Sequence, residues 1–160
     1  MTTPPFILAL REKVGTMPLW LSGITAVVVR DDEVLIIKRS DNGRWAPVAG
    51  IIEPGEHPAE TAEREVLEEA GLVVEVERIA GVDVSAPVSY PNGDETQFLV
   101  VVLRCRWISG DPHPVDGEAT EALWVPVSEL AGLDPELSEA SLRRIGWALS
   151  DDPAAAFRRA

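Results

Sequence analysis

The chain has 160 residues, of which 46% are hydrophobic and 26% are charged, as expected for a globular protein with a core of its own. Its 27 acidic and 14 basic residues give a formal net charge of −13, which argues against nucleic acids and anionic membranes as partners. The single cysteine permits no internal disulfide and favours a cytoplasmic protein. No segment is apolar over the length needed to span a bilayer. We therefore expect a single domain over residues 1–160 with a small anionic substrate.

The first predicted element is a short helix over residues 4–14. It lies in an N-terminal helical extension, residues 1–20, whose apolar side chains are a candidate contact in a homodimer. Two β-branched runs, Ile24–Val29 and Val34–Ile37, then flank a polar turn and predict a β-hairpin. Both runs are apolar on both faces, so we expect both sides of the sheet to be covered.

The segment Gly50–Leu72, GIIEPGEHPAETAEREVLEEAGL, predicts a loop followed by a helix. Pro58 suits the first helical position and Gly71 suits the position after the last one, with strong helix formers between them. At 3.6 residues per turn, four apolar side chains form one stripe: Ala59, Ala62, Val66 and Ala70. This stripe is expected to pack against the sheet.

Three carboxylates of the same helix, from Glu65, Glu68 and Glu69, lie on an adjacent arc of roughly 100°. Like charges at helical spacing destabilise one another, so such a cluster indicates a cation. Carboxylate oxygens with no cysteine nearby are typical ligands of Mg²⁺, with Mn²⁺ as an alternative. Arg64 is planar and permanently charged, and we expect it to hold Glu56 or the other acids in position.

Four further strands are predicted after this helix, over Val73–Ile79, Gly81–Ser85, Gln97–Trp107 and Leu123–Val127. A second helix is predicted to begin at Asp134-Pro135, an acid at the N-cap followed by proline at the first helical position. It is expected to cover the other face of the sheet. Residues 151–160 are expected to form a flexible tail.

The segment Gly50–Leu72 resembles the Nudix box, GX5EX7REUXEEXGU with U an aliphatic residue, and matches it at every defined position. The resemblance implies an α/β/α sandwich with a mixed central sheet. It also implies hydrolysis of a nucleoside diphosphate linked to another group, by attack of a metal-activated water on one phosphorus of the pyrophosphate. That mechanism agrees with the physics, because bound divalent cations acidify water and neutralise phosphoryl oxygens.

The resemblance also implies roles for individual residues. The expected metal ligands are three carboxylates and one backbone carbonyl, those of Glu65, Glu68, Glu69 and Ala49. The expected catalytic residues are Arg64, Glu68, Glu69 and a general base, for which Glu118 is the first candidate and Glu121 the second. Structural support of the site is expected from Gly50, Glu56 and Gly71.

The residues around the box bear on the substrate. Ala49-Gly50 stands where many members carry Leu-Pro-Gly-Gly, and it resembles the ADP-ribose and ADP-sugar pyrophosphatases. Pro87 resembles a downstream proline of that subfamily, whereas Tyr90 resembles a tyrosine of diadenosine polyphosphate hydrolases. The sequence slightly favours ADP-ribose or a related ADP-sugar. Dinucleoside polyphosphates and nucleoside triphosphates are the alternatives.

Three side chains outside the box are candidate substrate contacts: Arg39 for a phosphate, and Trp45 and Tyr90 for stacking on a base. Two other functions on the same fold are disfavoured. A non-catalytic nucleotide sensor would be expected to lose one or more of the acids, and this box retains all of them. A prenyl diphosphate isomerase would be expected to carry a cysteine near the site, and Cys105 lies far along the chain from the box.

Overall fold

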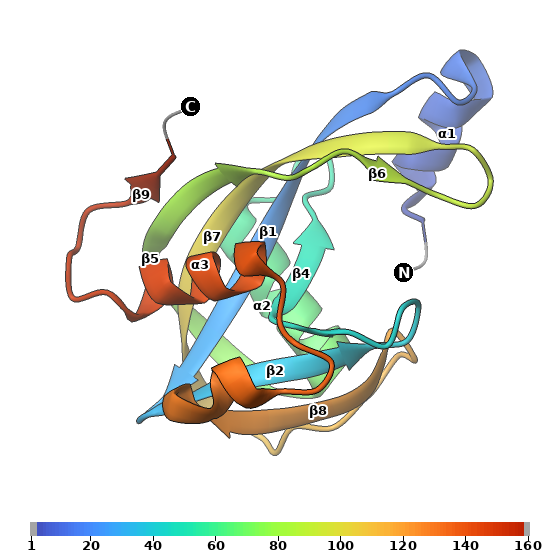
Figure 1. Ribbon diagram of the computed structural model, residues 1–160. Helices are drawn as coiled ribbons and strands as arrows, with labels where there is room; N and C mark the ends of the chain where they lie inside the picture. Colours follow the sequence, from blue (N-terminus) through green and yellow to red (C-terminus); the bar gives the residue numbers. More distant parts are fainter. Residues whose placement is uncertain (1–2, 159–160) are drawn as a thin grey trace.

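The computed structural model describes residues 3–158. A mixed β-sheet forms its centre, with α2 (Pro58–Ala70) against one face and α3 (Glu139–Leu149) against the other (Figure 1). The predicted α/β/α sandwich is therefore confirmed. Helix α1 (Pro5–Val14), which the sequence also predicts, projects from one end of the sheet (Figure 1).

Within residues 3–158 the sheet has nine strands: β1 (Leu19–Arg30), β2 (Glu33–Arg39), β3 (Trp45–Ala46), β4 (Val48–Ile51), β5 (Val73–Val84), β6 (Val88–Ser89), β7 (Glu95–Ser109), β8 (Ala119–Pro126) and β9 (Ala156–Phe157). Their order is β3-β2-β1-β7-β5-β9, while β4 pairs with β1, β6 with β7 and β8 with β2. The pairs β1–β7 and β5–β9 are parallel. The short strands β3, β4, β6 and β9 were not among the predicted elements.

Strands β1 and β2 form the predicted hairpin, but they pair only beside the turn, where Val29 faces Val34. Farther along, β1 pairs with β4, so that Ile24 faces Gly50 and Thr25 faces Ala49. Strand β2 pairs instead with β8. The divergence of the hairpin thus makes room for β4, which brings the first residue of the box alongside β1.

Successive residues of β1 serve two separate cores. Val28 packs with the apolar stripe of α2, while Val27 packs with α3 through Ile145. This alternation follows from the pleat of a strand, in which neighbouring side chains point to opposite faces. It confirms that a strand apolar on both faces is covered on both sides.

The segment predicted as two strands around Ala80 is the single long strand β5. Its pairing with β7 shifts register between Ile79 and Gly81, so the apparent break is a bulge within one strand. A side chain at Gly81 would put its Cβ 2.4 Å from the ring of Trp147. This glycine therefore serves the close approach of α3 rather than the end of a strand.

The prediction that α3 begins at Asp134-Pro135 is wrong, because the helix begins at Glu139. The hydroxyl of Ser138 accepts a hydrogen bond from the backbone N–H of Ser141 at 3.1 Å, so Ser138 is the N-cap. A 3₁₀ helix, η1 (Val127–Gly132), precedes this segment and was not predicted.

The C-terminal residues that the sequence assigns to a flexible tail include β9. Ala156 and Phe157 pair with Gly81 and Val82 of β5, because the outer edge of β5 offers unpaired backbone groups. Among residues 3–158, no helix is long and apolar enough to cross a membrane.

Candidate active site

Helix α2 is placed by local signals at both of its ends. Pro58 stands in the first turn, and the carboxylate of Glu60 accepts a hydrogen bond from the backbone N–H of His57 at 3.0 Å. At the other end, Gly71 adopts a left-handed φ of +69° and donates its N–H to Leu67. Three of the four residues of the apolar stripe, Ala62, Val66 and Ala70, are buried against the sheet, which fixes the acidic edge of the helix beside β4.

Gly50 permits the close approach of α2 to β4. A Cβ at this position would lie 2.2 Å from the carboxylate carbon of Glu65, closer than non-bonded atoms can come. Only glycine therefore lets the side chain of Glu65 lie directly against the strand. This is the physical basis for the first defined position of the box.

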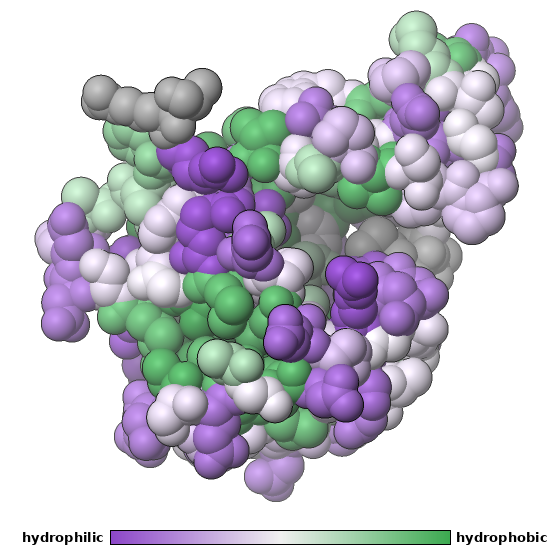
Figure 2. All heavy atoms as spheres, viewed as in Figure 1, coloured by the Kyte–Doolittle hydropathy of each residue, from purple (hydrophilic) through white to green (hydrophobic). Residues whose placement is uncertain are grey.

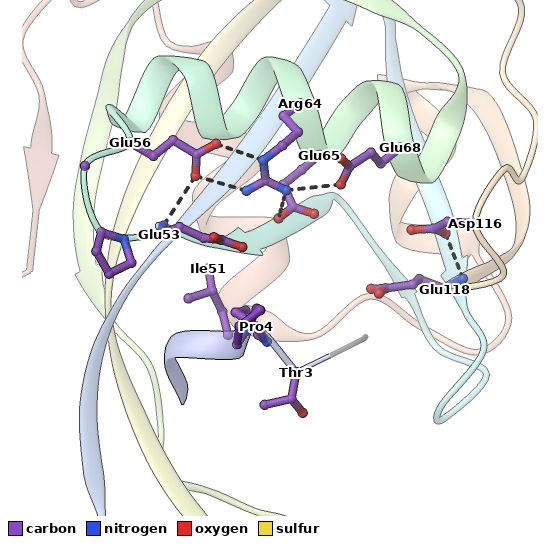
Figure 3. A pocket seen from close by; sticks show the side chains of 13 residues that line it. Thr3, Pro4, Ile51, Glu53, Glu56, Arg64, Glu65, Glu68, Asp116 and Glu118 are labelled. Atoms are coloured by element: carbon purple, nitrogen blue, oxygen red, sulfur yellow. Dashed lines mark hydrogen bonds and ion pairs between the residues drawn. The ribbon is translucent and has the colours of Figure 1, made fainter. Parts of the chain in front are cut away.

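Arg64 is the centre of the hydrogen-bonded acids in Figure 3. Its Nε and Nη2 donate to the two carboxylate oxygens of Glu56 at 2.8 and 3.0 Å. Its Nη1 donates to Glu65 at 2.9 Å and to Glu68 at 3.1 Å. Sequence analysis offered Glu56 or the other acids as partners of Arg64, and the structure shows Arg64 hydrogen-bonded to Glu56 and to two of those acids, Glu65 and Glu68.

The opposite wall comes from the loop between β7 and β8 (Figure 3). Asp116 and Glu118 line, together with Glu65 and Glu68, a cavity of about 650 Å³ that we call the acid cavity. An Asp116 carboxylate oxygen accepts a hydrogen bond from the backbone N–H of Glu118 at 2.9 Å. The backbone carbonyl of Glu118 accepts a hydrogen bond from the backbone N–H of Ser40. One of these hydrogen bonds lies within the loop, and the other ties the loop to the end of β2.

The buried carboxylates differ sharply in acidity. Burial, together with the charges of Glu65, Glu118 and Asp116, raises the pKa of Glu69 to about 8. Burial also raises the pKa of Glu65 to about 7, against the opposing effect of Arg64. Hydrogen bonds from Arg64 lower the pKa of Glu56 to about 2. Glu56 therefore stays ionised at neutral pH, whereas burial favours the protonated forms of Glu65 and Glu69.

These carboxylates fit a divalent cation in donor type and in charge. Hard oxygen donors suit Mg²⁺ and Mn²⁺, and a cation would stabilise the charged forms that burial now disfavours. Glu65, Glu68 and Glu69 would hold it. In residues 3–158 no three acidic, histidine or cysteine side chains converge on one point, since Arg64 lies between Glu65 and Glu68.

Arg39 connects this site to a second cavity. A hydrogen bond from its guanidinium to Asp41 raises the pKa of Arg39, and the charges of Glu69 and Glu118 add to the effect. The same side chain lines a cavity of about 320 Å³ next to Ala49 of β4. Arg39 therefore lies where it could contact a ligand that occupies both cavities.

This second cavity, which we call the α3-side cavity, is lined by aromatic and polar side chains. Among them are Thr25 of β1, Tyr90 of the β6–β7 turn, Phe98 of β7 and Arg144 of α3. Figure 2 shows a hollow beside α3, between that helix and the β6–β7 hairpin. Rings and hydrogen-bonding groups around one hollow suit a flat, polar ligand.

Two of the residues proposed from the sequence lie elsewhere. Trp45 is only 7% exposed and packs in the core beneath α3, with its ring N–H donated to the carbonyl of Asp134 at 3.0 Å. Its predicted contact with substrate is therefore corrected to a packing role. Glu121 pairs with Lys38 at 2.9 Å on neighbouring strands and lies outside the residues that line the acid cavity, which leaves Glu118 as the stronger candidate base.

Several lining residues were not identified from the sequence, among them Asp116, Phe98 and Arg144. Asp116 stands two residues before Glu118, in the pattern Asp-Gly-Glu. The sequence indicated a loop here with Glu118 as a candidate base, but it assigned no role to Asp116, which also lines the acid cavity. Phe98 and Arg144 reach the α3-side cavity from β7 and α3. In the sequence, Arg144 stands beside the buried residues of α3, Ser141, Ile145 and Ala148. A charged residue at such a position could have indicated that α3 also contributes to a binding site.

Comparison with known proteins assigns the family. The model of the NUDIX domain matches residues 21–145. The chain is 35% identical over 121 residues to a MutT-like protein of Streptomyces ambofaciens, covering 75% of this chain and 73% of that protein. It is 36% identical over 113 residues to an ADP-ribose pyrophosphatase of Methanocaldococcus jannaschii, covering 69% and 64%.

Other relatives are much longer than this chain. The human 8-oxo-dGDP phosphatase NUDT18 is 32% identical over 130 residues, and the match covers 79% of this chain but only 37% of that protein. Among solved structures, a NUDIX hydrolase from Nitrosomonas europaea superposes with a TM-score of 0.66 at 24% identity, over 81% of this chain and 88% of that one. The family model, the relatives and the fold agree, and the chain belongs to the NUDIX family of pyrophosphohydrolases.

Proposed function

We propose that this chain uses Mg²⁺ to hydrolyse the pyrophosphate bond of a nucleoside diphosphate linked to another group, with Mn²⁺ as a substitute. The observation that carries the proposal is the arrangement of two cavities that share Ile51. One presents carboxylates suited to metal, the other presents aromatic rings, and Arg39 lines the second within the electrostatic reach of the first. A pyrophosphate with a nucleoside on one side matches this arrangement.

Each group has a defined task in this proposal. Glu65, Glu68 and Glu69, with the carbonyl of Ala49, would hold the metal, which when bound would acidify a water molecule and neutralise phosphoryl oxygens. Glu118 would accept the proton of the attacking water, because it faces Glu65 and Glu68 from the opposite wall of the acid cavity.

Arg64 and Arg39 contribute through charge. Arg64 keeps Glu56, Glu65 and Glu68 in fixed positions through its hydrogen bonds. Binding of a metal to Glu65 and Glu68 requires those two carboxylates to use oxygens that Arg64 leaves available, or to exchange one hydrogen bond for the metal. Arg39 contacts a phosphate oxygen and Tyr90 stacks on the base.

The linkage of the substrate is proposed from both sequence and relatives. The markers Ala49-Gly50 and Pro87 favour ADP-ribose or an ADP-sugar, and one relative is named an ADP-ribose pyrophosphatase. The alternatives are dinucleoside polyphosphates and nucleoside triphosphates; relatives named a MutT-like protein and an 8-oxo-dGDP phosphatase give these weight. A function without catalysis, that of a nucleotide sensor, is disfavoured because no acid of the box is replaced.

A substrate panel tests the proposal. ADP-ribose, NADH, dinucleoside polyphosphates, nucleoside triphosphates and nucleotide sugars are incubated with purified protein and Mg²⁺, Mn²⁺ or EDTA, and products are separated by ion-exchange chromatography. We expect metal-dependent cleavage of the nucleotide sugars at the pyrophosphate. Turnover of nucleoside triphosphates alone would exclude the preferred linkage, and binding without turnover of any compound would support a sensor.

We also propose that the protein is cytoplasmic and forms a homodimer through its N-terminal helical extension. Leu8, Met17 and Trp20 are each more than half exposed there, which is a large apolar area for a surface segment. Analytical ultracentrifugation of the wild type and of Met17→Glu tests this assembly. A monomeric wild-type protein would contradict it.

A further inference from the structure

The α3-side cavity has a positive charge built into one wall. The carboxylate of Asp83, 3% exposed, accepts hydrogen bonds from Nη2 of Arg143 at 2.8 Å and from Nε of Arg144 at 3.1 Å. The pKa of Asp83 is lowered, since hydrogen bonds from these two arginines outweigh the effect of its burial. Two cations on one anion leave a net charge of about +1 at this wall, in a chain whose total charge is −13.

The two arginines are not equivalent. Arg144 lines the α3-side cavity, whereas Arg143 lies outside its lining and approaches the ring of Trp147 at 5.8 Å. Within the described residues, the one other hydrogen bond from Arg144 is a long one of 3.4 Å, from Nη1 to the hydroxyl of Thr25. In the part of the chain that the structure describes, residues 3–158, no atom accepts a hydrogen bond from its Nη2. Arg144 is thus held mainly through Nε, and the N–H groups of Nη2, with the second N–H of Nη1, are available to a ligand.

The chemistry of this wall selects among bases. Arginine has donors and no acceptor, so it pairs with an edge that presents two neighbouring acceptors. Guanine presents O6 and N7 in that way, whereas adenine presents an N6 amine, a donor, beside N7. Phe98 and Tyr90 in the same cavity supply ring surfaces for a flat base.

We propose that Arg144 is a specificity-determining residue that favours a 6-oxopurine, as in guanine, over adenine in the α3-side cavity. The inference rests on the proposed function and refines the base of the substrate while leaving its linkage unchanged. It departs from the slight preference for adenine given by Ala49 and Pro87. Those two residues bear on the base through resemblance alone, whereas Arg144 supplies donors inside the cavity itself.

A pair of substrates that differ only in the base tests this inference. We expect kcat/KM for GDP-mannose to exceed that for ADP-mannose by about tenfold, within the range of one good bidentate pair. In Arg144→Gln the ratio should fall to about one or reverse, because an amide both donates and accepts and so suits adenine. Arg144→Lys should give an intermediate ratio, since it keeps the charge and loses the planar fork.

Arg143→Gln is the matched control. It removes the other guanidinium on Asp83 and leaves the cavity lining intact, so the ratio should stay at the wild-type value. Equal kcat/KM for the two substrates in the wild type, or an equal change of the ratio in Arg143→Gln and Arg144→Gln, would overturn the inference.

Calorimetric affinities for GDP and ADP give the same comparison without catalysis. If no compound of the substrate panel is cleaved, the proposed function fails, while the affinities still decide the base preference. Equal affinities for GDP and ADP would reject the role of Arg144 even if both sugars are hydrolysed.

Discussion

The two cavities lie beside the same short strand, β4, but they are built in opposite ways. The acid cavity takes its key side chains from one helix and one loop, and it concentrates negative charge around Arg64. The α3-side cavity takes single side chains from several distant elements, and its arginines outnumber its one acid, Asp41. The acid cavity is suited to binding the metal and the pyrophosphate, and the α3-side cavity is suited to binding the rest of the substrate.

This contrast indicates which cavity determines substrate specificity. Carboxylates at helical spacing recognise a cation and phosphates, which all substrates of this class share. The residues that distinguish one nucleotide from another come together only when β1, β7 and α3 meet. Changes to the acid cavity should therefore impair metal use and hydrolysis.

The largest expected effect follows from Glu69→Gln. Glu69 is 3% exposed, and glutamine matches its shape but supplies no negative charge to a metal. We expect kcat to fall at least about a hundredfold, the size expected when a group essential to charge stabilisation is removed, with an unchanged circular dichroism spectrum. Mg²⁺-dependent phosphate release near the wild-type rate would show that Glu69 is not a metal ligand.

Next comes the comparison of Glu118→Gln with Glu121→Gln. Glu118 faces the acid cavity, and loss of a general base lowers kcat by about a hundredfold or more. Glu121 is engaged with Lys38 on the sheet, so its variant serves as the control and should retain most of its activity. Equal losses in the two variants would contradict the assignment of the base.

Gly50→Ala should break the contact between β4 and α2. The added methyl would overlap the Glu65 carboxylate, and relieving such overpacking costs about 1–3 kcal/mol. We expect a lower melting temperature and a weaker response to Mg²⁺. Gly146→Ala is the control, because nothing lies within 4 Å of a Cβ there, and alanine in a helix should stabilise the protein slightly.

The smallest expected effect is the pH dependence of metal stabilisation. The pKa of Glu69 is raised from 4.5 to about 8 and that of Glu65 from 4.5 to about 7. Between pH 4.5 and about pH 8, the folded metal-free protein therefore binds more protons than the unfolded chain. Its stability therefore falls as the pH rises through this window. We expect Mg²⁺ to raise the melting temperature more at pH 8 than at pH 6, as measured by differential scanning fluorimetry. An equal rise at both pH values would be evidence against the shifted carboxylates.

Elements whose ends depend on neighbouring residues were predicted closely, whereas short strands that depend on distant pairing partners were not. Helix α2 spans Pro58–Ala70 as its proline and glycine boundaries indicate, because capping depends on residues within one turn. The short strands β4 and β9 exist only through partners far along the chain. The start of α3 was misplaced because both Asp134 and Ser138 are good N-cap residues, and only the packing of the intervening Leu137 into the core decides between them.

The reaction class can be read from the chain alone, since the acids, the arginine and the glycines of the box stand at fixed offsets within 23 consecutive residues. Helical periodicity is enough to bring such residues together. Long-range packing, by contrast, places Trp45 in the core, Asp116 in the acid cavity and Arg144 in the α3-side cavity. Those positions depend on sheet order and helix packing, which bring together residues more than 100 positions apart, such as Thr25 and Arg144.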